Sequence, residues 1–281
     1  MSSDNQYLNL NGRLFDLSEP VVMGILNVTP DSFYSGNRFT GDKTIAHAAE
    51  KIVADGAKII DVGGYSTRPN AEEITVDEEI RRVSNALEIV RKRFGDVPVS
   101  VDTFRSAVVR HVVRNYGVEV INDISGGALD PLMFETVADM KVAYVLMHSR
   151  GNPKTMQSLT GYDELVPEVL MFLNKRIGQL RLLGVNDIIV DPGFGFAKTT
   201  EQNYTLLRKL PYFSELDVPL LAGVSRKSMV CKVLECTPEE ALNGTTAVHM
   251  MALMGGASIL RVHDVKEAVE TIKIYNAFIV G

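Results

Sequence analysis

Polar side chains that can bind anions, heterocycles or metal ions follow short apolar runs at many points of this 281-residue chain. Asn27 is the first case: it follows the apolar run 21–26 and precedes a polar segment that contains Pro30. Such a run is typical of a strand buried on both faces, and the loop after it delivers the side chains of a site. The later members of the series are Asp61, Asp102, Asn122 with Asp123, His148, Asp191, Ser225 with Arg226 and Lys227, and Arg261 with His263.

Three members of the series, Asp102, Asn122 and Asp191, directly follow hydrophobic runs and have few obvious protein partners. A buried carboxylate must be paired or hydrogen-bonded. The set therefore indicates a ligand rich in N–H donors, such as a flat heterocycle with an aminopyrimidine edge, because a carboxylate accepts two parallel N–H bonds. The alternative is that each aspartate caps the helix that follows it.

A second set is cationic and consists of Arg68, Lys227, Arg261 and His263. On a chain with a formal net charge of -6, cations at strand ends indicate an anion site. The segments GVSRKS and RVHD follow the last two strands, where α/β barrels commonly bind phosphate. For any one of these cations, Lys227 included, a solvated surface charge is the alternative.

The segment DPGFGFAK, residues 191–198, is the third feature of interest. Gly193 and Gly195 allow a close backbone approach, and Phe196 offers a flat face to an aromatic substrate. The alternative is a tight loop with Phe196 in the core. We interpret His47, His111 and His249 as surface or packing residues, and no HxxxH or cysteine cluster indicates a structural metal.

Composition limits the class of protein. The chain is 46% hydrophobic and 23% charged, which is typical of a globular protein. No apolar run approaches the roughly 20 residues of a membrane span, and the N-terminus lacks the pattern of a signal peptide. We expect a cytoplasmic protein in which Cys231 and Cys236 are free thiols within one helical segment. The absence of a Lys/Arg block argues against nucleic acid or a membrane as a partner.

The elements that must position these side chains alternate between strand and helix. Alternation around Asn11-Gly12 predicts a hairpin over residues 7–17 that caps one end of the domain. The strands are predicted at 21–26, 58–64, 97–101, 118–121, 142–147, 187–190, 219–222 and 258–260. The helices are predicted at 42–55, 76–94, 105–116, 131–140, 163–183, 201–210, 238–254 and 265–278.

This alternation predicts an α/β fold, a (β/α)8 TIM barrel that forms one domain over residues 1–281, with the hairpin within residues 1–18. The alternative is an open, doubly wound sheet. The first strand is not followed by a GxGxxG fingerprint, and no topological switch is evident.

Eight motifs in order, over nearly the whole chain, resemble the dihydropteroate synthases of the pterin-binding barrel family. They are MGILNVTPDSF, DVGGYSTRP, VDT, INDISGG, VLMHSRG, DPGFGFAK, GVSRKS and LRVHDV. The resemblance implies an enzyme that joins (7,8-dihydropterin-6-yl)methyl diphosphate to 4-aminobenzoate, and a homodimer. It further implies Mg²⁺-assisted departure of diphosphate and attack of the aryl amine on a pterin methylene cation.

The resemblance also implies the role of each site residue. The pterin would be bound by Asp102, Asn122, Asp191, Lys227 and Met147. The diphosphate would be bound by Asn27, Arg68, Arg261 and His263. The 4-aminobenzoate pocket would consist of Phe33, Thr67, Pro69, Phe196 and Ser228. Catalysis would fall to Asp102, Lys227 and Asn27, with Asn27 as the Mg²⁺ ligand.

The chain departs from the family pattern at three positions. Tyr65 stands where Glu is usual, Asn70 where Gly is usual, and Ser35 where an acidic residue is common.

Two other functions compete: a pterin-binding methyltransferase domain that serves a corrinoid protein, and a non-catalytic pterin-binding homologue. A diphosphate site argues against the first, and the intact Asn27, Lys227 and RVH motif argue against the second. The apolar residues of 238–254 exceed what one barrel-facing stripe needs, which favours dimerisation through the last helices.

Overall fold

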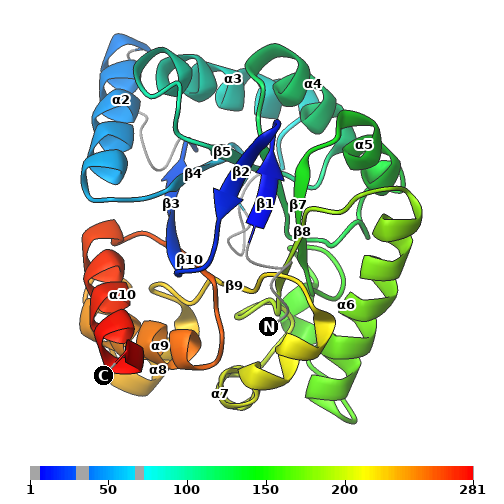
Figure 1. The fold of residues 1–281 in the computed structure, drawn as a ribbon, viewed down its shortest axis with the longest axis vertical. Helices are drawn as coiled ribbons and strands as arrows, with labels where there is room; N and C mark the ends of the chain where they lie inside the picture. The colour runs from blue at the N-terminus through cyan, green and yellow to red at the C-terminus, as the bar shows by residue number, and fades with distance from the viewer. Residues whose placement is uncertain (1–6, 30–37, 67–72, 281) are drawn as a thin grey trace.

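Eight parallel strands close into a barrel in the computed structural model, which describes residues 7–29, 38–66 and 73–280 (Figure 1). Their order in the sheet is β8-β7-β6-β5-β4-β3-β10-β9. The strands are β3 (Val21–Asn27), β4 (Ile59–Gly63), β5 (Val99–Asp102), β6 (Val120–Asp123), β7 (Ala143–Met147), β8 (Ile188–Asp191), β9 (Leu221–Ala222) and β10 (Ile259–Val262). A bridge between Val190 and Leu220 joins the two ends of the sheet, so the predicted barrel is confirmed and the open sheet is excluded.

Helices surround the barrel on all sides (Figure 1). They are α2 (Arg38–Ala54), α3 (Val76–Arg93), α4 (Ser106–Tyr116), α5 (Met133–Met140), α6 (Leu165–Leu182), α7 (Thr200–Arg208), α8 (Ser228–Leu234), α9 (Leu242–Met254) and α10 (Val265–Val280). Two 3-10 helices, η2 (Met156–Ser158) and η3 (Leu210–Leu216), were not predicted. Among the described residues, no helix has the length and apolar character that a membrane span requires.

The segment between β9 and β10 differs from the sequence prediction. We expected one helix over 238–254, but the chain forms α8 and then α9, which begins only at Leu242. Glu235 ends α8 in the left-handed conformation, with φ at 52°. Cys236 therefore lies beyond α8 and not in the same helix as Cys231, although both thiols are free as predicted.

Side-chain caps explain where two of the helices begin. The Thr75 side chain accepts from the backbone N–H of Glu78 at the start of α3. Thr199 and Gln202 form a reciprocal capping box at the start of α7. Both helices follow loops at the carboxyl ends of strands, so the caps also fix where those loops end.

The N-terminal hairpin closes one mouth of the barrel. Strands β1 (Tyr7–Leu10) and β2 (Arg13–Asp16) form the predicted hairpin around Asn11 and Gly12, whose φ angles of 52° and 82° fit a type I′ turn. Leu8, Leu10 and Leu17 pack against the inward-facing residues of the barrel strands, and the hairpin crosses the barrel centre in Figure 1. The opposite mouth, at the carboxyl ends of the strands, is left for a site.

Candidate functional site

Seven of the predicted site residues lie at the carboxyl ends of barrel strands. They are Asn27, Asp102, Asn122, Met147, Asp191, Arg261 and His263. Asn27, Asp102, Met147 and Asp191 are the last residues of β3, β5, β7 and β8. Neighbouring strands set them side by side: Asp102 is opposite Asn122, and Met147 is opposite Asp191. A cavity of about 700 Å³ opens at this mouth. Its lining includes Asn27, Tyr65, Asp102, Phe196, Lys227, Arg261 and His263.

A cluster of one guanidinium, two carboxylates and an amide lies at the cavity wall. Arg261 Nε donates to Asp61 Oδ2 at 2.7 Å, and Arg261 Nη2 donates to Asp102 Oδ2 at 2.8 Å. Asn122 Nδ2 donates to the same Asp61 oxygen at 3.1 Å. The expectation that Asp102 and Asn122 have few protein partners is therefore wrong. Arg261 is a member of the predicted anion-binding set, and its hydrogen bond to Asp102 links that set to the residues predicted to bind a heterocycle.

Asp61 is a site residue to which sequence reasoning gave no role. Its side chain is fully buried, and its Oδ1 atom has no hydrogen-bond partner among the residues that the structure describes. A buried acceptor without a partner costs free energy, which is typical of a group that awaits a donor from a ligand. The signal in the sequence was its position before Gly63-Gly64, at the end of an apolar strand.

Burial changes the proton affinity of the groups around the cavity. It raises the pKa of Asp102 to about 7, against the opposing positive charge of Arg261. Burial also raises the pKa of Asp191, and the nearby Lys227 ammonium opposes this change. It lowers the pKa of Lys227 to about 8, with Asp191 opposing. Lys227 and Asp191 thus stabilise one another's charged forms in a poorly solvated site.

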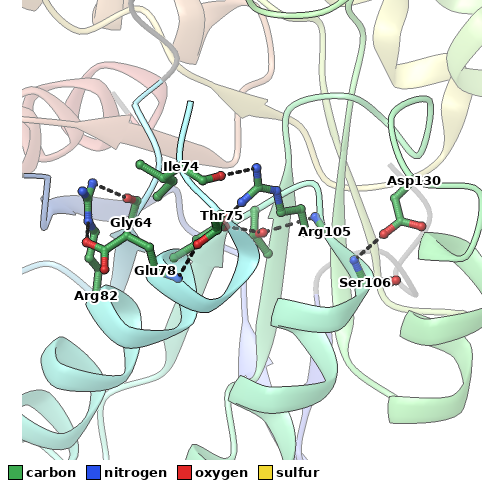
Figure 2. A network of polar contacts seen from close by, with 10 residues as sticks. Gly64, Ile74, Thr75, Glu78, Arg82, Arg105, Ser106 and Asp130 are labelled. Carbon is green, nitrogen blue, oxygen red and sulfur yellow. Dashed lines mark hydrogen bonds and ion pairs between the residues drawn. The ribbon is translucent and has the colours of Figure 1, made fainter. Parts of the chain in front are cut away.

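The capping alternative is wrong for both aspartates. Asp130 Oδ2 accepts from the N–H of Ser106 at 2.7 Å at the start of α4 (Figure 2), so Asp102 is left to Arg261. The side chain of Asp191 accepts from Gly193 N at 2.7 Å, and the cap of α7 comes from Thr199. Asp191 Oδ1 is used in this turn, whereas Oδ2 lies 3.8 Å from the position a side chain at Gly223 would occupy on the cavity wall.

The loop after β8 brings an aromatic ring and a lysine together. The ammonium of Lys227 lies 4.6 Å from the centre of the Phe196 ring and donates to the carbonyl of Phe194. Phe194 is fully buried, whereas Phe196 lines the cavity. The core alternative for Phe196 is therefore wrong, and so is the surface alternative for Lys227. Gly193 is required here: its φ is 75°, and a Cβ would lie 1.9 Å from the His148 carbonyl oxygen.

The remaining predicted residues are less fully placed. Ser228 is exposed at the start of α8 and is not part of the cavity lining. Arg226 lies at the cavity but forms a bidentate ion pair with Asp264 at 2.7 Å. Four predicted site residues lie outside the described residues: Phe33, Thr67, Arg68 and Pro69. The departures from the family pattern at Ser35 and Asn70 also lie outside them.

Arg105 contacts residues at both described ends of the loop that follows β4, and Figure 2 shows its contact with Ile74. Its guanidinium donates to the Ile74 carbonyl at 2.8 Å and to buried Glu79 at 2.9 Å. The same guanidinium lies 5.2 Å from the centre of the Tyr65 ring, which lines the cavity. Tyr65, the departure from the family's Glu, is thus accommodated by stacking on Arg105.

The site offers few protein ligands for a metal ion. Within the described residues, no group of three or more His, Cys, Asp or Glu side chains could hold one. Asn27 presents an amide oxygen at the cavity, and a side chain at Gly63 would come within 2.9 Å of it. Mg²⁺ usually keeps several waters and binds through few protein oxygens plus substrate phosphates. The donor set fits an ion that is bound mainly by a phosphorylated substrate.

The barrel and its polar cavity define an α/β-barrel enzyme for a small polar molecule. Residues 23–263 match the family model described as pterin binding enzyme. The chain is 45% identical over 268 residues to the dihydropteroate synthase of Synechocystis sp., with 94% of this chain and 92% of the relative covered. It is 43% identical to that of Escherichia coli, with 95% and 94% covered.

The fold agrees with these relatives. The dihydropteroate synthase of Xanthomonas albilineans, solved with 4-aminobenzoic acid, superposes with a TM-score of 0.91 at 38% identity, and 99% of each chain is covered. This chain belongs to the pterin-binding enzyme family, among the dihydropteroate synthases.

Proposed function

We propose that this chain condenses (7,8-dihydropterin-6-yl)methyl diphosphate with 4-aminobenzoate to give 7,8-dihydropteroate and diphosphate. The observation that carries the proposal is the cluster of Asp61, Asp102, Asn122 and Arg261 beside Lys227 and Asp191. Asp102, Arg261 and Lys227 line the cavity and present both hydrogen-bond acceptors and donors to it. That pattern complements the amide and amino groups along the edge of a pterin ring.

In this proposal the pterin lies between the strand ends with its polar edge toward the barrel. Asp191 Oδ2 accepts from the ring's amino-pyrimidine N–H groups, and Lys227 donates to a ring acceptor. Asn122 and Asp102 complete the polar edge, while buried Met147 packs against the ring face. Asn122 and Asp191 are buried at the carboxyl ends of their strands, which supports an orientation with the polar edge of the ring toward the barrel.

The reaction then needs electrostatic stabilisation more than proton transfer. The bond between the pterin methylene carbon and the diphosphate oxygen breaks, and the electron pair leaves with the diphosphate. The ionised form of Asp102, held by Arg261, stabilises the cationic methylene. The neutral aryl amine forms the new carbon–nitrogen bond and loses one proton, so no strong general base is required.

We assign the departing diphosphate to Asn27, Arg68, Arg261 and His263, and Asn27 would hold Mg²⁺. When bound, Mg²⁺ supplies Lewis-acid stabilisation of the leaving group. The aryl amine is assigned to Phe33, Thr67, Pro69, Phe196 and Ser228. Phe196 at the cavity supports this pocket, and its ring lies beside Lys227.

We propose further that two copies associate through the last helices in the cytoplasm. Met251 and Met254 on α9 and Ile274 and Phe278 on α10 are exposed apolar side chains, more than half accessible each. Such a surface suits a two-fold interface. Light scattering should give twice the monomer mass at micromolar concentration and a monomer for Phe278→Glu. The free thiols support a reducing compartment.

Turnover by the purified chain tests the reaction itself. Diphosphate should be released only when both substrates and Mg²⁺ are present, and mass spectrometry should find dihydropteroate in equal amount. A chain that bound the pterin substrate but released no diphosphate with 4-aminobenzoate would contradict the proposal and favour a binding protein. Methyl transfer from methyltetrahydrofolate to a corrinoid would favour the methyltransferase.

A further inference from the structure

Lys198 is a buried lysine that the proposed reaction does not use. Burial lowers its pKa to about 7, and the charge of Asp191 opposes this change. Lys198 ends the segment DPGFGFAK, and only 4% of its surface is exposed. Its Nζ atom lies 2.9 Å from the carbonyl oxygen of Gly193, 3.1 Å from that of Phe196 and 3.1 Å from Nδ1 of His148. In its ammonium form Lys198 has three N–H donors, and here each of them has a partner.

The three partners belong to two neighbouring strand ends. Gly193 and Phe196 are in the loop between β8 and α7, so two of the hydrogen bonds fold this loop around the ammonium. His148 directly follows β7 and is buried, with its ring against Phe172 at 4.9 Å. Because Lys198 donates, Nδ1 of His148 accepts and the proton of the neutral ring is on Nε2. Burial and the Lys198 charge lower the pKa of His148 to about 2, which keeps that ring neutral.

The loop that Lys198 holds carries three contacts of the cavity. The Gly193 N–H orients Asp191, the Phe194 carbonyl accepts from Lys227, and the Phe196 ring lies beside the Lys227 ammonium. Each contact depends on the direction of a peptide group or ring between residues 193 and 196. Lys198 fixes the carbonyl groups at both ends of that stretch.

We propose that Lys198 is a positioning residue: its bonds to the 193–196 loop and to His148 hold Asp191, Phe196 and Lys227 in the geometry that binds both substrates. The choice of substrates rests on the proposed function. Stability alone does not account for a lysine here, because an apolar side chain of similar length would avoid the cost of burying an ammonium. The hydrogen bonds that Lys198 donates therefore fix the conformation of the 193–196 loop.

Lys198→Met is the direct test, and Lys175→Met, an exposed lysine on α6, is the matched control. We expect Lys198→Met to unfold cooperatively, with a tenfold or greater rise in the KM for 4-aminobenzoate and in the Kd for 6-hydroxymethyl-7,8-dihydropterin. Lys175→Met should keep wild-type constants. Wild-type constants in Lys198→Met would overturn the inference, even if its melting temperature fell.

His148 provides a milder test if Lys198→Met does not fold. His148→Leu removes one acceptor, whereas His148→Asn can return an oxygen to the position of Nδ1. We expect KM for 4-aminobenzoate to rise in His148→Leu and to recover in His148→Asn. Equal KM values in His148→Leu and His148→Asn would contradict the inference. They would show that the hydrogen bond from Lys198 to residue 148 does not affect 4-aminobenzoate binding.

A fluorescence experiment separates this inference from the proposed reaction. The chain has no tryptophan, so Phe196→Trp gives a single reporter in the loop. Adding His148→Leu should raise its quenching by acrylamide, and adding His148→Asn should not. Failure of the wild type to turn over would refute the reaction and leave this result standing. Turnover with unchanged quenching in all variants would refute only the role of Lys198.

Discussion

Arg261 and Asp102 are 159 residues apart in the chain, yet their side chains meet at 2.8 Å at the mouth of the barrel. The same guanidinium binds Asp61 at 2.7 Å. One cation thus compensates the buried Asp61 carboxylate and the half-buried Asp102 carboxylate, which come from different strands. The two side chains meet because β10, the last strand, pairs with β3, the first strand of the barrel, so that Arg261 lies near the ends of β4 and β5.

Arg261→Met should therefore destabilise the fold in a pH-dependent way. Removing one partner of a buried ion pair typically costs about 3–5 kcal/mol. Burial already raises the pKa of Asp102, and loss of the Arg261 charge removes what opposes that rise. The folded variant then binds more protons than the unfolded chain, so its stability increases as pH falls below the raised pKa. Urea unfolding at pH 8 and pH 5.5 should show a larger loss at pH 8; an equal loss would contradict the pairing.

Asp191→Asn should weaken pterin binding without weakening the fold. The change keeps the shape but places an N–H donor opposite the donors of the pterin edge. We expect a loss of at least about 2 kcal/mol of binding free energy. The melting temperature should change little, because the Lys227 ammonium, whose pKa burial already lowers to about 8, can lose its proton once the Asp191 charge no longer opposes that change. Calorimetric titration with a dihydropterin checks this, with Asp163→Asn, an exposed site, as the control. Wild-type affinity in Asp191→Asn would contradict the orientation proposed for the ring.

The order of the elements was predictable, because apolar runs and turn residues are local signals. Side-chain partners at the site were not. Asp61 and Arg261 are 200 residues apart, and only closure of the barrel brings them together. Likewise, the inward direction of Lys198 depends on the left-handed turn at Ala197, where φ is 50°. Neither the residue types nor their spacing indicate such contacts.

His249 should make stability depend on mildly acidic pH. It is buried on α9, and its Nε2 atom has no hydrogen-bond partner within the described part of the chain. Burial lowers its pKa to about 4 from 6.5. Between these values the unfolded chain binds the proton and the folded chain does not. Stability is therefore lost as pH falls, by up to about 1.4 kcal/mol per pH unit for this one group.

Between pH 6 and pH 4.5, His249→Gln should reduce the slope of the unfolding free energy against pH. His47→Gln, at an exposed site on α2, should not. A slope that His249→Gln left unchanged would assign the acid sensitivity to other groups.

Arg105 and Arg81 allow a comparison of a buried and an exposed ion pair near the same loop. Arg105 binds Glu79, whose side chain is fully buried and whose pKa is raised by burial, whereas Arg81 binds Glu78 with 69% of the arginine side chain exposed.

Removing Arg105 leaves the buried Glu79 carboxylate without its ion-pair partner, and Thr103 is then its remaining side-chain donor among the described residues. Arg105→Met should therefore cost about 3–5 kcal/mol of unfolding free energy, whereas Arg81→Met should cost less than about 1 kcal/mol. Arg105→Met also removes the guanidinium from Tyr65 and from the Ile74 carbonyl, so we expect a higher KM for 4-aminobenzoate as well. Denaturant titration and steady-state kinetics measure the two effects. Equal stabilities of the two variants would show that Glu79 does not depend on Arg105, and a wild-type KM in Arg105→Met would show that the loop is positioned without it.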